Sequence, residues 1–360
     1  MRLDRLRAKL AESKLASFLV SDITNIRYLS GFTGSPGDAL LLITQSKAII
    51  ATDFRYWEQA ERQCPGFELL EISTKLGPGM GEILARVDGH RVGFEADEVT
   101  IAHYNRWMEP QGDILWVPTT DWVRQLRTIK DSHEIALMRN AVALADESLA
   151  HGLHQVRPGM TERELAWIME AYMRTRGAEK VSFDFIVAAG ANGAMAHYRP
   201  SDVPLPEGQP IVIDMGAQLQ GYCSDLTRTV CLGEPAEPKL FWEVYNTVLA
   251  AQLRAEEGIR AGMTGIAADA LARQVISDAG YGKQFGHGLG HGVGLEVHEK
   301  PRASHLSEDT LTAGNLITVE PGIYIRGWGG VRIEDIILVA EDGASVLTQA
   351  PKEPIVRGDW

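Results

Sequence analysis

Cysteine is scarce in this 360-residue chain, and long apolar runs are missing. The only cysteines are Cys64, Cys223 and Cys231, and none has a CxxC or other zinc-ligand spacing. This pattern argues against a disulfide framework and a structural zinc site, and it is typical of a reducing cytoplasm. No apolar stretch approaches the roughly 20 residues of a membrane span, and the charged N-terminus has no apolar signal core. We therefore expect a cytoplasmic protein with no membrane partner.

Positive charge is also in short supply. Lysine and arginine together number 35 against 48 aspartates and glutamates, which gives a formal net charge of −13. Nucleic acids and anionic membrane surfaces repel such a chain, so we expect no nucleic-acid partner. Bound cations could neutralise part of this charge. The length of the chain favours two domains.

The first 125 residues alternate short β-rich runs with helical stretches. SFLVS, ALLLIT, KAIIAT, FELLEI, RVGFEA and DILWVP are typical of strands, and DFRYWEQAERQ predicts a helix. This alternation predicts an α/β domain over residues 1–125. The basic, polar stretch VRQLRTIKD marks the junction, and residues 126–360 form a second domain. That domain opens with a helix over about residues 132–155, where apolar side chains recur at helical spacing.

The second domain contains an internal repeat. VRPGMT at residues 156–161 and IRAGMT at residues 259–264 each lie between two helical stretches. In each, a glycine permits the chain reversal and a threonine can cap the next helix. Each helix pair is followed by β-rich sequence, so we interpret the domain as two related halves with a ligand groove between them. A chance match of six residues is the alternative.

Two aspartates flank a glycine-rich turn. Asp214 follows the apolar run IVI, and Asp225 comes eleven residues later, beyond Gly216 and Gly221. A carboxylate directly after a buried strand is costly to desolvate without a partner. The spacing suits a hairpin that brings both carboxylates to one place, with Thr227 as a supporting hydroxyl. Ordinary turn-flanking aspartates are the alternative for this segment taken alone.

The segment GHGLGHGVGLEVHE contains three histidines, His287, His291 and His298, among alternating glycines. The glycines exclude a stable helix and allow close approach of backbone and imidazoles. Neither HExxH nor GxGxxG is present, which argues against a helical zinc protease site and a dinucleotide loop. A single histidine is usually structural, but three in such a setting indicate a functional site.

Two glutamates complete the set. Glu320 ends a β-rich run in TVEPGIYI, and Glu334 is expected within the apolar strand VRIEDIILV. A glutamate in such a strand needs a cation or several hydrogen bonds, with a salt bridge to Arg332 as the alternative. Together the carboxylates and one imidazole predict a cage for two divalent metals and hence metal-assisted hydrolysis. Carboxylates favour Mn²⁺, while the imidazole leaves Co²⁺, Fe²⁺ and Zn²⁺ as options.

The order Asp, Asp, His, Glu, Glu, with D-x10-D, GHGVG, EPG and RIED, resembles the pita-bread metallopeptidases. This group includes methionine aminopeptidase, aminopeptidase P and prolidase. The resemblance implies an α/β creatinase-like N-terminal domain over 1–125. It implies an α+β pita-bread catalytic domain, with an internal pseudo-twofold repeat, over 126–360. The N-terminal domain favours the proline-specific branch, because methionine aminopeptidases usually lack it.

The resemblance also implies a role for each matching residue. The metal ligands would be Asp214, Asp225, His291, Glu320 and Glu334. Asp225 and Glu334 would contact both ions, and Glu320 would also carry a proton to the leaving nitrogen. His298 would stabilise the tetrahedral intermediate. The residues that bind the substrate would be His197, His287, Arg302 and Arg332. His197 would also be one of the catalytic residues.

These residues predict hydrolysis of Xaa-Pro bonds in proline-containing peptides. We favour an Xaa-Pro aminopeptidase, which releases the residue before proline. The alternative is an Xaa-Pro dipeptidase (prolidase), in which Arg302 could hold the free carboxylate of a dipeptide. A metal-free, creatinase-like hydrolase and a non-catalytic binding module are less favoured, because all five ligands are present. The resemblance further implies a homodimer.

Overall fold

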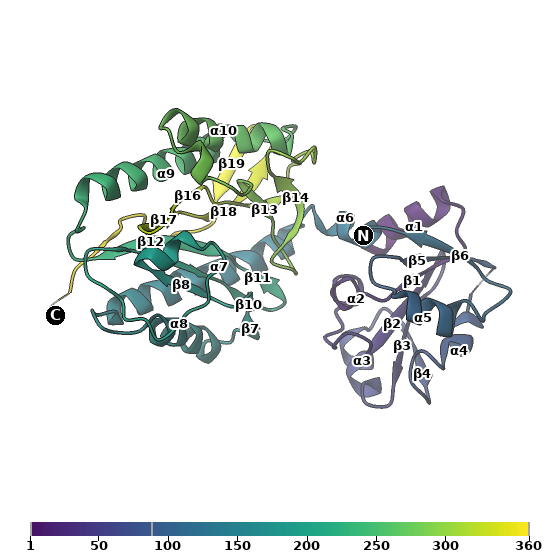
Figure 1. Cartoon of the computed structure of the whole chain (residues 1–360). Helices are drawn as coiled ribbons and strands as arrows, with labels where there is room; N and C mark the ends of the chain where they lie inside the picture. The colour runs from purple at the N-terminus through teal and green to yellow at the C-terminus, as the bar shows by residue number, and fades with distance from the viewer. Residues whose placement is uncertain (1, 88, 359–360) are drawn as a thin grey trace. The chain divides into compact units, whose positions relative to one another are not determined.

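The computed structural model describes residues 2–87 and 89–358, which divide into two compact units between Arg127 and Thr128 (Figure 1). The sequence analysis placed the boundary after residue 125. Each unit has its own hydrophobic core, as expected for a chain of this length. Among the described residues, no helix is both long enough and apolar enough to cross a membrane.

The first unit is built on a mixed sheet of six strands in the order β4-β3-β2-β1-β5-β6. The strands are β1 (Ser17–Val20), β2 (Ala39–Thr44), β3 (Ala48–Asp53), β4 (Glu68–Ile72), β5 (Arg91–Glu95) and β6 (Leu115–Thr119). The helices are α1 (Arg2–Glu12), α2 (Ile23–Ser30), α3 (Trp57–Gln63), α4 (Met80–Leu84), α5 (Ile101–His103) with the π-helical turn η1 (Tyr104–Met108), and α6 (Trp122–Arg127). All six strands coincide with the β-rich runs in the sequence.

Helix α3 begins later than its sequence pattern predicted. Asp53 ends strand β3, and its carboxylate accepts a hydrogen bond from the backbone N–H of Arg55. Such an aspartate turn competes with helix formation. The helix therefore starts only at Trp57.

The second unit contains two helix pairs and the strands that follow each pair. The helices are α7 (Ser132–Gln155), α8 (Glu162–Thr175), α9 (Pro238–Gly258) and α10 (Gly265–Asp278), with the short 3₁₀ helices η2 (Gly190–Ala194) and η3 (Gly282–Gln284). Thr161 and Thr264, the threonines of the internal repeat, cap α8 and α10 with their side chains. In Figure 1, α9 and α10 cover one side of the strands, and α7 and α8 cover the other.

The strands of the second unit form two main sheets, one in each half. The first half contributes β20-β12-β9-β8 and the smaller sheet β11-β10-β7, and the second contributes β14-β13-β15-β18-β19 and the pair β16-β17. First-half strands are β7 (Lys180–Val181), β8 (Ile186–Ala189), β9 (Pro210–Met215), β10 (Ala217–Leu219), β11 (Tyr222–Cys223) and β12 (Leu226–Leu232). Second-half strands are β13 (Gly290–Gly292), β14 (Glu299–Ala303), β15 (Leu316–Val319), β16 (Gly322–Ile325), β17 (Gly329–Arg332), β18 (Asp335–Ala340) and β19 (Gly343–Val346). The last strand, β20 (Ile355–Val356), returns to pair with β12 in the first-half sheet.

Candidate metal centre

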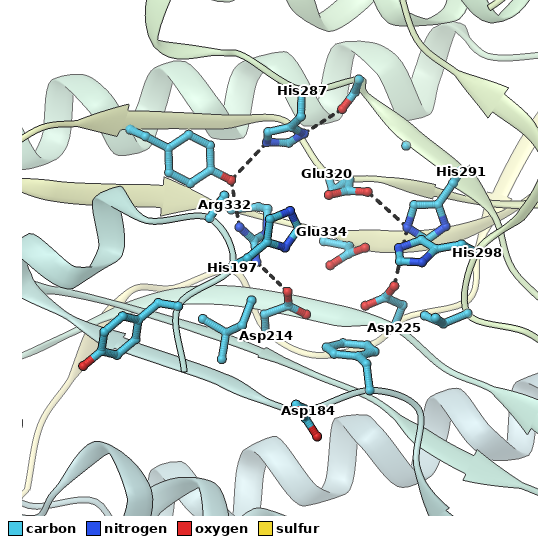
Figure 2. A pocket seen from close by; sticks show the side chains of 18 of the residues that line it. Asp184, His197, Asp214, Asp225, His287, His291, His298, Glu320, Arg332 and Glu334 are labelled. Atoms are coloured by element: carbon cyan, nitrogen blue, oxygen red, sulfur yellow. Dashed lines mark hydrogen bonds and ion pairs between the residues drawn. The ribbon is translucent and has the colours of Figure 1, made fainter. Parts of the chain in front are cut away.

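A cavity of about 530 Å³ opens in the second unit. This volume lies in the usual range for a small-molecule site. All ten candidate residues line it: His197, Asp214, Asp225, His287, His291, His298, Arg302, Glu320, Arg332 and Glu334. In Figure 2 the four carboxylates face a common space, with His291 and His298 at one side of them.

The two aspartates lie on neighbouring antiparallel strands. Asp214 is near the end of β9, where it is paired with Thr227 of β12. Asp225 directly precedes β12 and is only 5% exposed. The strand β9 is strongly apolar before Asp214, so packing of the strand fixes the carboxylate at the edge of the core. The hairpin-like return of the chain thus brings both carboxylates into the cavity, as their spacing predicted.

His291 and Glu320 come from the second half of the unit. The ring nitrogen Nδ1 of His291 lies 3.0 Å from the carbonyl oxygen of Gly292 and donates to it, so Nε2 is the nitrogen at which a bound cation would replace a proton. Nε2 faces the carboxylates of Glu320 and Asp225, at 3.3 Å and 3.7 Å respectively. Such an orientation is that of a histidine prepared to bind a cation through Nε2.

Steric crowding explains why the residue before His291 is a glycine. A Cβ atom at Gly290 would lie 2.0 Å from the backbone carbonyl oxygen of Thr318 on the neighbouring strand β15. Any other residue would push β13 away from β15. The Thr318 hydroxyl accepts a hydrogen bond from the backbone N–H of His291 and donates one to Glu320, so it links these two residues.

Glu334 is placed differently from the sequence expectation. It lies in the short break between β17 and β18 rather than within a strand, and it is 2% exposed. The hydroxyl of Thr227 donates to its carboxylate at 2.6 Å. Arg332, the expected salt-bridge partner, instead binds Asp214 at 2.5 Å. A simple Arg332–Glu334 salt bridge therefore does not account for this buried glutamate.

The electrostatics of the cluster follow from burial. Removal from water, followed by repulsion from neighbouring carboxylates, raises the pKa values of Asp225 and Glu334 well above their usual range. Burial also raises the pKa of Asp214, although Arg332 opposes that effect. Burial acts in the same direction on Glu320, but hydrogen bonding and charge from His291 outweigh it and lower its pKa. Without a bound cation, the surrounding protein therefore stabilises the negative charge of these carboxylates poorly.

The donor set fits divalent cations. Ligand atoms of Asp225, His291 and Glu334 all lie within 4.8 Å of one another. The oxygen Oδ1 of Asp214 is buried and has no hydrogen-bond partner among the described residues. An unsatisfied buried acceptor beside mutually repelling carboxylates is stabilised by a positive ion, and oxygen donors with one imidazole suit hard or borderline divalent metals.

A second group of residues lines the opposite part of the cavity. Burial lowers the pKa of His287, so its ring is neutral near pH 7. Its Nδ1 donates to Gly288 and its Nε2 accepts from the hydroxyl of Tyr324 at 3.0 Å. Arg332 donates to the same hydroxyl at 2.7 Å. Sequence reasoning missed Tyr324, although it lies only four residues after Glu320 in the segment TVEPGIY.

The other histidines and Arg302 lie at different depths. The ring of His298 packs edge to face on that of His291, with centroids 4.4 Å apart. His197 is exposed at the cavity wall, in the segment that follows η2. Arg302 belongs to β14, and among the described residues no carboxylate pairs with its guanidinium, whereas Arg199, which also lines the cavity, pairs with Asp184. Within the part of the chain that the structure describes, Arg302 is thus a cavity-wall arginine without a carboxylate partner.

Comparison with known families covers both units. Residues 136–341 match metallopeptidase family M24, and residues 2–129 match the creatinase/prolidase N-terminal domain. These matches confirm the predicted fold class, in which a creatinase-like domain precedes a pita-bread catalytic domain. They also agree with the family resemblance inferred from the motifs.

Individual relatives extend over almost the whole chain. An Xaa-Pro dipeptidase of Pyrococcus furiosus is 36% identical over 98% of this chain and 99% of its own length. The structure of an Xaa-Pro dipeptidase from Bacillus anthracis has a TM-score of 0.94 and 40% identity, with 99% of each chain covered. That of an X-Pro aminopeptidase from Thermotoga maritima has a TM-score of 0.90 and 36% identity, covering 99% of this chain and all of the other.

Proposed function

This chain belongs to metallopeptidase family M24, and from that membership and its cavity we propose that it is an Xaa-Pro dipeptidase. Prolidases were the alternative in the sequence analysis, and the relatives support them better than the aminopeptidase that was favoured there. The observation that carries the proposal is the unpaired Arg302 on the wall of the carboxylate-lined cavity. A dipeptide presents a free carboxylate that a guanidinium can bind.

We assign two divalent ions to Asp214, Asp225, His291, Glu320 and Glu334, with Mn²⁺ as the favoured metal. Co²⁺, Fe²⁺ and Zn²⁺ are the alternatives, because one ligand is an imidazole. When bound, the ions would polarise the scissile carbonyl and lower the pKa of an attacking water. Ligand atoms of Asp225 and Glu334 lie within 4.8 Å of each other, and these two residues would serve both ions.

Residues around the donors would handle protons and developing charge. A proline nitrogen carries no hydrogen within a peptide, so it must gain a proton as it leaves. Glu320 lines the cavity beside His291, and as a carboxylate it would take a proton from the attacking water and pass it to that nitrogen. Burial and the nearby His291 lower the pKa of His298, so its neutral ring can donate an N–H to the carbonyl oxygen as negative charge develops there.

Substrate binding would use the rest of the wall. His287, held by Tyr324 and Gly288, would contact the proline ring, and Arg332 would hold Asp214 in place for the N-terminal amine. His197 would contact the substrate from the exposed side of the cavity. We further propose a cytoplasmic homodimer. The three buried, unpaired cysteines are consistent with that location, and light scattering after size-exclusion chromatography tests the dimer.

The direct test compares an Xaa-Pro dipeptide with the matching Xaa-Pro-Yaa tripeptide. We expect a higher kcat/KM for the dipeptide. Replacing Arg302 by methionine should lower kcat/KM for the dipeptide about 10- to 100-fold, since a charge-assisted hydrogen bond contributes about 1.5–3 kcal/mol. The tripeptide rate should change little, so it is the internal control.

Two outcomes would contradict the proposal at different levels. Faster cleavage of the tripeptide by the wild-type protein would favour the Xaa-Pro aminopeptidase interpretation instead. The similarity to the X-Pro aminopeptidase from Thermotoga maritima supports that interpretation. Failure to cleave either peptide in the presence of each candidate metal would reject Xaa-Pro hydrolysis altogether.

A further inference from the structure

Glu162, the first residue of helix α8, is a fully buried carboxylate with an unusual number of partners. Its two oxygens accept five hydrogen bonds of 2.8–3.0 Å. The donors are the backbone N–H groups of Ala189 and Ser201, the side-chain amide of Asn192, and the hydroxyls of Tyr198 and Ser201. Every donor belongs to residues 189–201, so the carboxylate closes this segment into a loop.

This loop forms part of the cavity wall. It leaves the end of β8, passes through η2, and contributes His197, Tyr198 and Arg199 to the lining. His197 is itself exposed, so packing constrains its ring little. The adjacent Tyr198 is anchored at both ends, because its hydroxyl binds Glu162 and its ring packs against the strands β8 and β9. The position of His197 therefore depends on the anchoring of its neighbour.

We propose that Glu162 is a positioning residue, which fixes the loop at residues 189–201 and so presents His197 to the substrate. The proposal rests on the proposed peptidase function only for the identity of that substrate. Glu162 lies outside the cavity lining and acts through the loop. The metal donors come from other segments, so loss of Glu162 should weaken substrate binding and leave metal binding intact.

Glutamine cannot replace this carboxylate without conflict. One oxygen faces the backbone N–H of Ala189 and the other faces that of Ser201. In either orientation, the amide NH₂ of Glu162→Gln would point at a fixed backbone donor. Two opposed donors in a buried site are unfavourable, so part of the loop must detach.

A purely structural role at the start of α8 is the competing explanation. Glu164, on the same turn, offers a matched control, since it completes the capping box with Thr161 and is exposed. Its described hydrogen bonds go to Thr161 and to no residue of the loop. Glu164→Gln thus removes a carboxylate charge at the helix start while leaving the loop anchors in place.

The experiment uses the full chain with Mn²⁺, an Xaa-Pro dipeptide, and hydrogen–deuterium exchange. Glu162→Gln should raise KM about tenfold, change kcat by less than about threefold, and speed exchange in residues 189–201 alone. Glu164→Gln should keep KM within about twofold. In a His197→Ala background, Glu162→Gln should add less than about a further twofold to KM, because both changes remove the same interaction.

Several results would overturn the inference. The first is that the effects of Glu162→Gln and His197→Ala on KM multiply in the double variant. The second is that Glu164→Gln raises KM as much as Glu162→Gln does. The third is that Glu162→Gln leaves hydrogen–deuterium exchange of the loop unchanged. If Glu162→Gln does not fold, Ser201→Ala removes one donor hydroxyl and should give a smaller shift in the same two measurements. If the wild-type protein does not cleave Xaa-Pro peptides, the proposed function is rejected. Hydrogen–deuterium exchange does not require turnover, so it would still test whether Glu162 anchors the loop.

Discussion

Replacing Asp335 by asparagine is expected to destabilise the second unit by about 3 kcal/mol. Asp335 is fully buried and directly follows Glu334 at the start of β18. Its carboxylate binds Arg228 at 2.7 Å, Lys352 at 2.7 Å and Gln252 at 2.9 Å. The substitution keeps the shape of the side chain and removes its charge, so it isolates the contribution of the ion pairs.

The magnitude follows from what remains after the change. Loss of one member of a buried ion pair costs about 3–5 kcal/mol, because the other charge is left without its counter-ion. Arg228 keeps four backbone carbonyl acceptors, and Lys352 keeps Glu256 at 3.1 Å. These remaining partners place the expected loss at the lower end of the range. For a unit of this size, about 3 kcal/mol lowers the Tm by roughly 6–12 °C.

Differential scanning calorimetry in the presence of a chelator measures this loss without a contribution from bound metal. Glu234→Gln is the matched control, since Glu234 pairs with Arg357 at 2.9 Å but both side chains are largely exposed. It should leave the Tm within about 1 °C. If Asp335→Asn lowers the Tm no more than this control does, the buried cluster does not stabilise the unit as argued.

Three further predictions concern other parts of the chain. Thr227→Val removes the hydroxyl that holds Glu334 and should weaken metal binding about 10- to 100-fold, as measured by competition with a chelator. An unchanged metal affinity would show that this hydrogen bond does not position Glu334 for the metal. Gly290→Ala drives a Cβ into a backbone carbonyl of β15 and should lower the unfolding free energy by about 1–3 kcal/mol in urea, whereas Gly286→Ala, with open space around it, should not. Burial raises the pKa of Glu95 to about 7, so the folded state binds this proton more tightly than the unfolded chain, and stability should fall as the pH rises from about 4.5 to 7. Urea unfolding across that range should show a flatter profile for Glu95→Gln, and an identical profile would refute the assignment.

Much of the fold was predictable because local patterns and packing agree. The apolar runs of the first unit all became strands, and the two repeated turns each end in a threonine that caps a helix. The predicted start of α3 was wrong because the side chain of Asp53 forms a turn, which the pattern of apolar residues does not reveal.

The pairing of side chains in the site was harder to predict. Arg332 lies two residues from Glu334 in sequence, yet it binds Asp214 on a distant strand. In sequence Tyr324 looks like an ordinary strand residue after Pro321 and Gly322, and only the arrangement of β16 and β17 brings its hydroxyl between His287 and Arg332. Such contacts depend on strand register across the two halves, which spacing along one segment does not determine.

The proposed metal donors are divided between the two halves of the second unit. Asp214 and Asp225 belong to the first half, and His291, Glu320 and Glu334 belong to the second. The complete donor set therefore exists only after both helix pairs have packed on their strands, and cation capture reports that the whole unit has assembled correctly. Free metal at a hundred times its Kd would stabilise the assembled form by about 2.7 kcal/mol. Metal scarcity would then shorten the lifetime of newly made chains by exposing them to proteolysis, in addition to reducing their catalytic output.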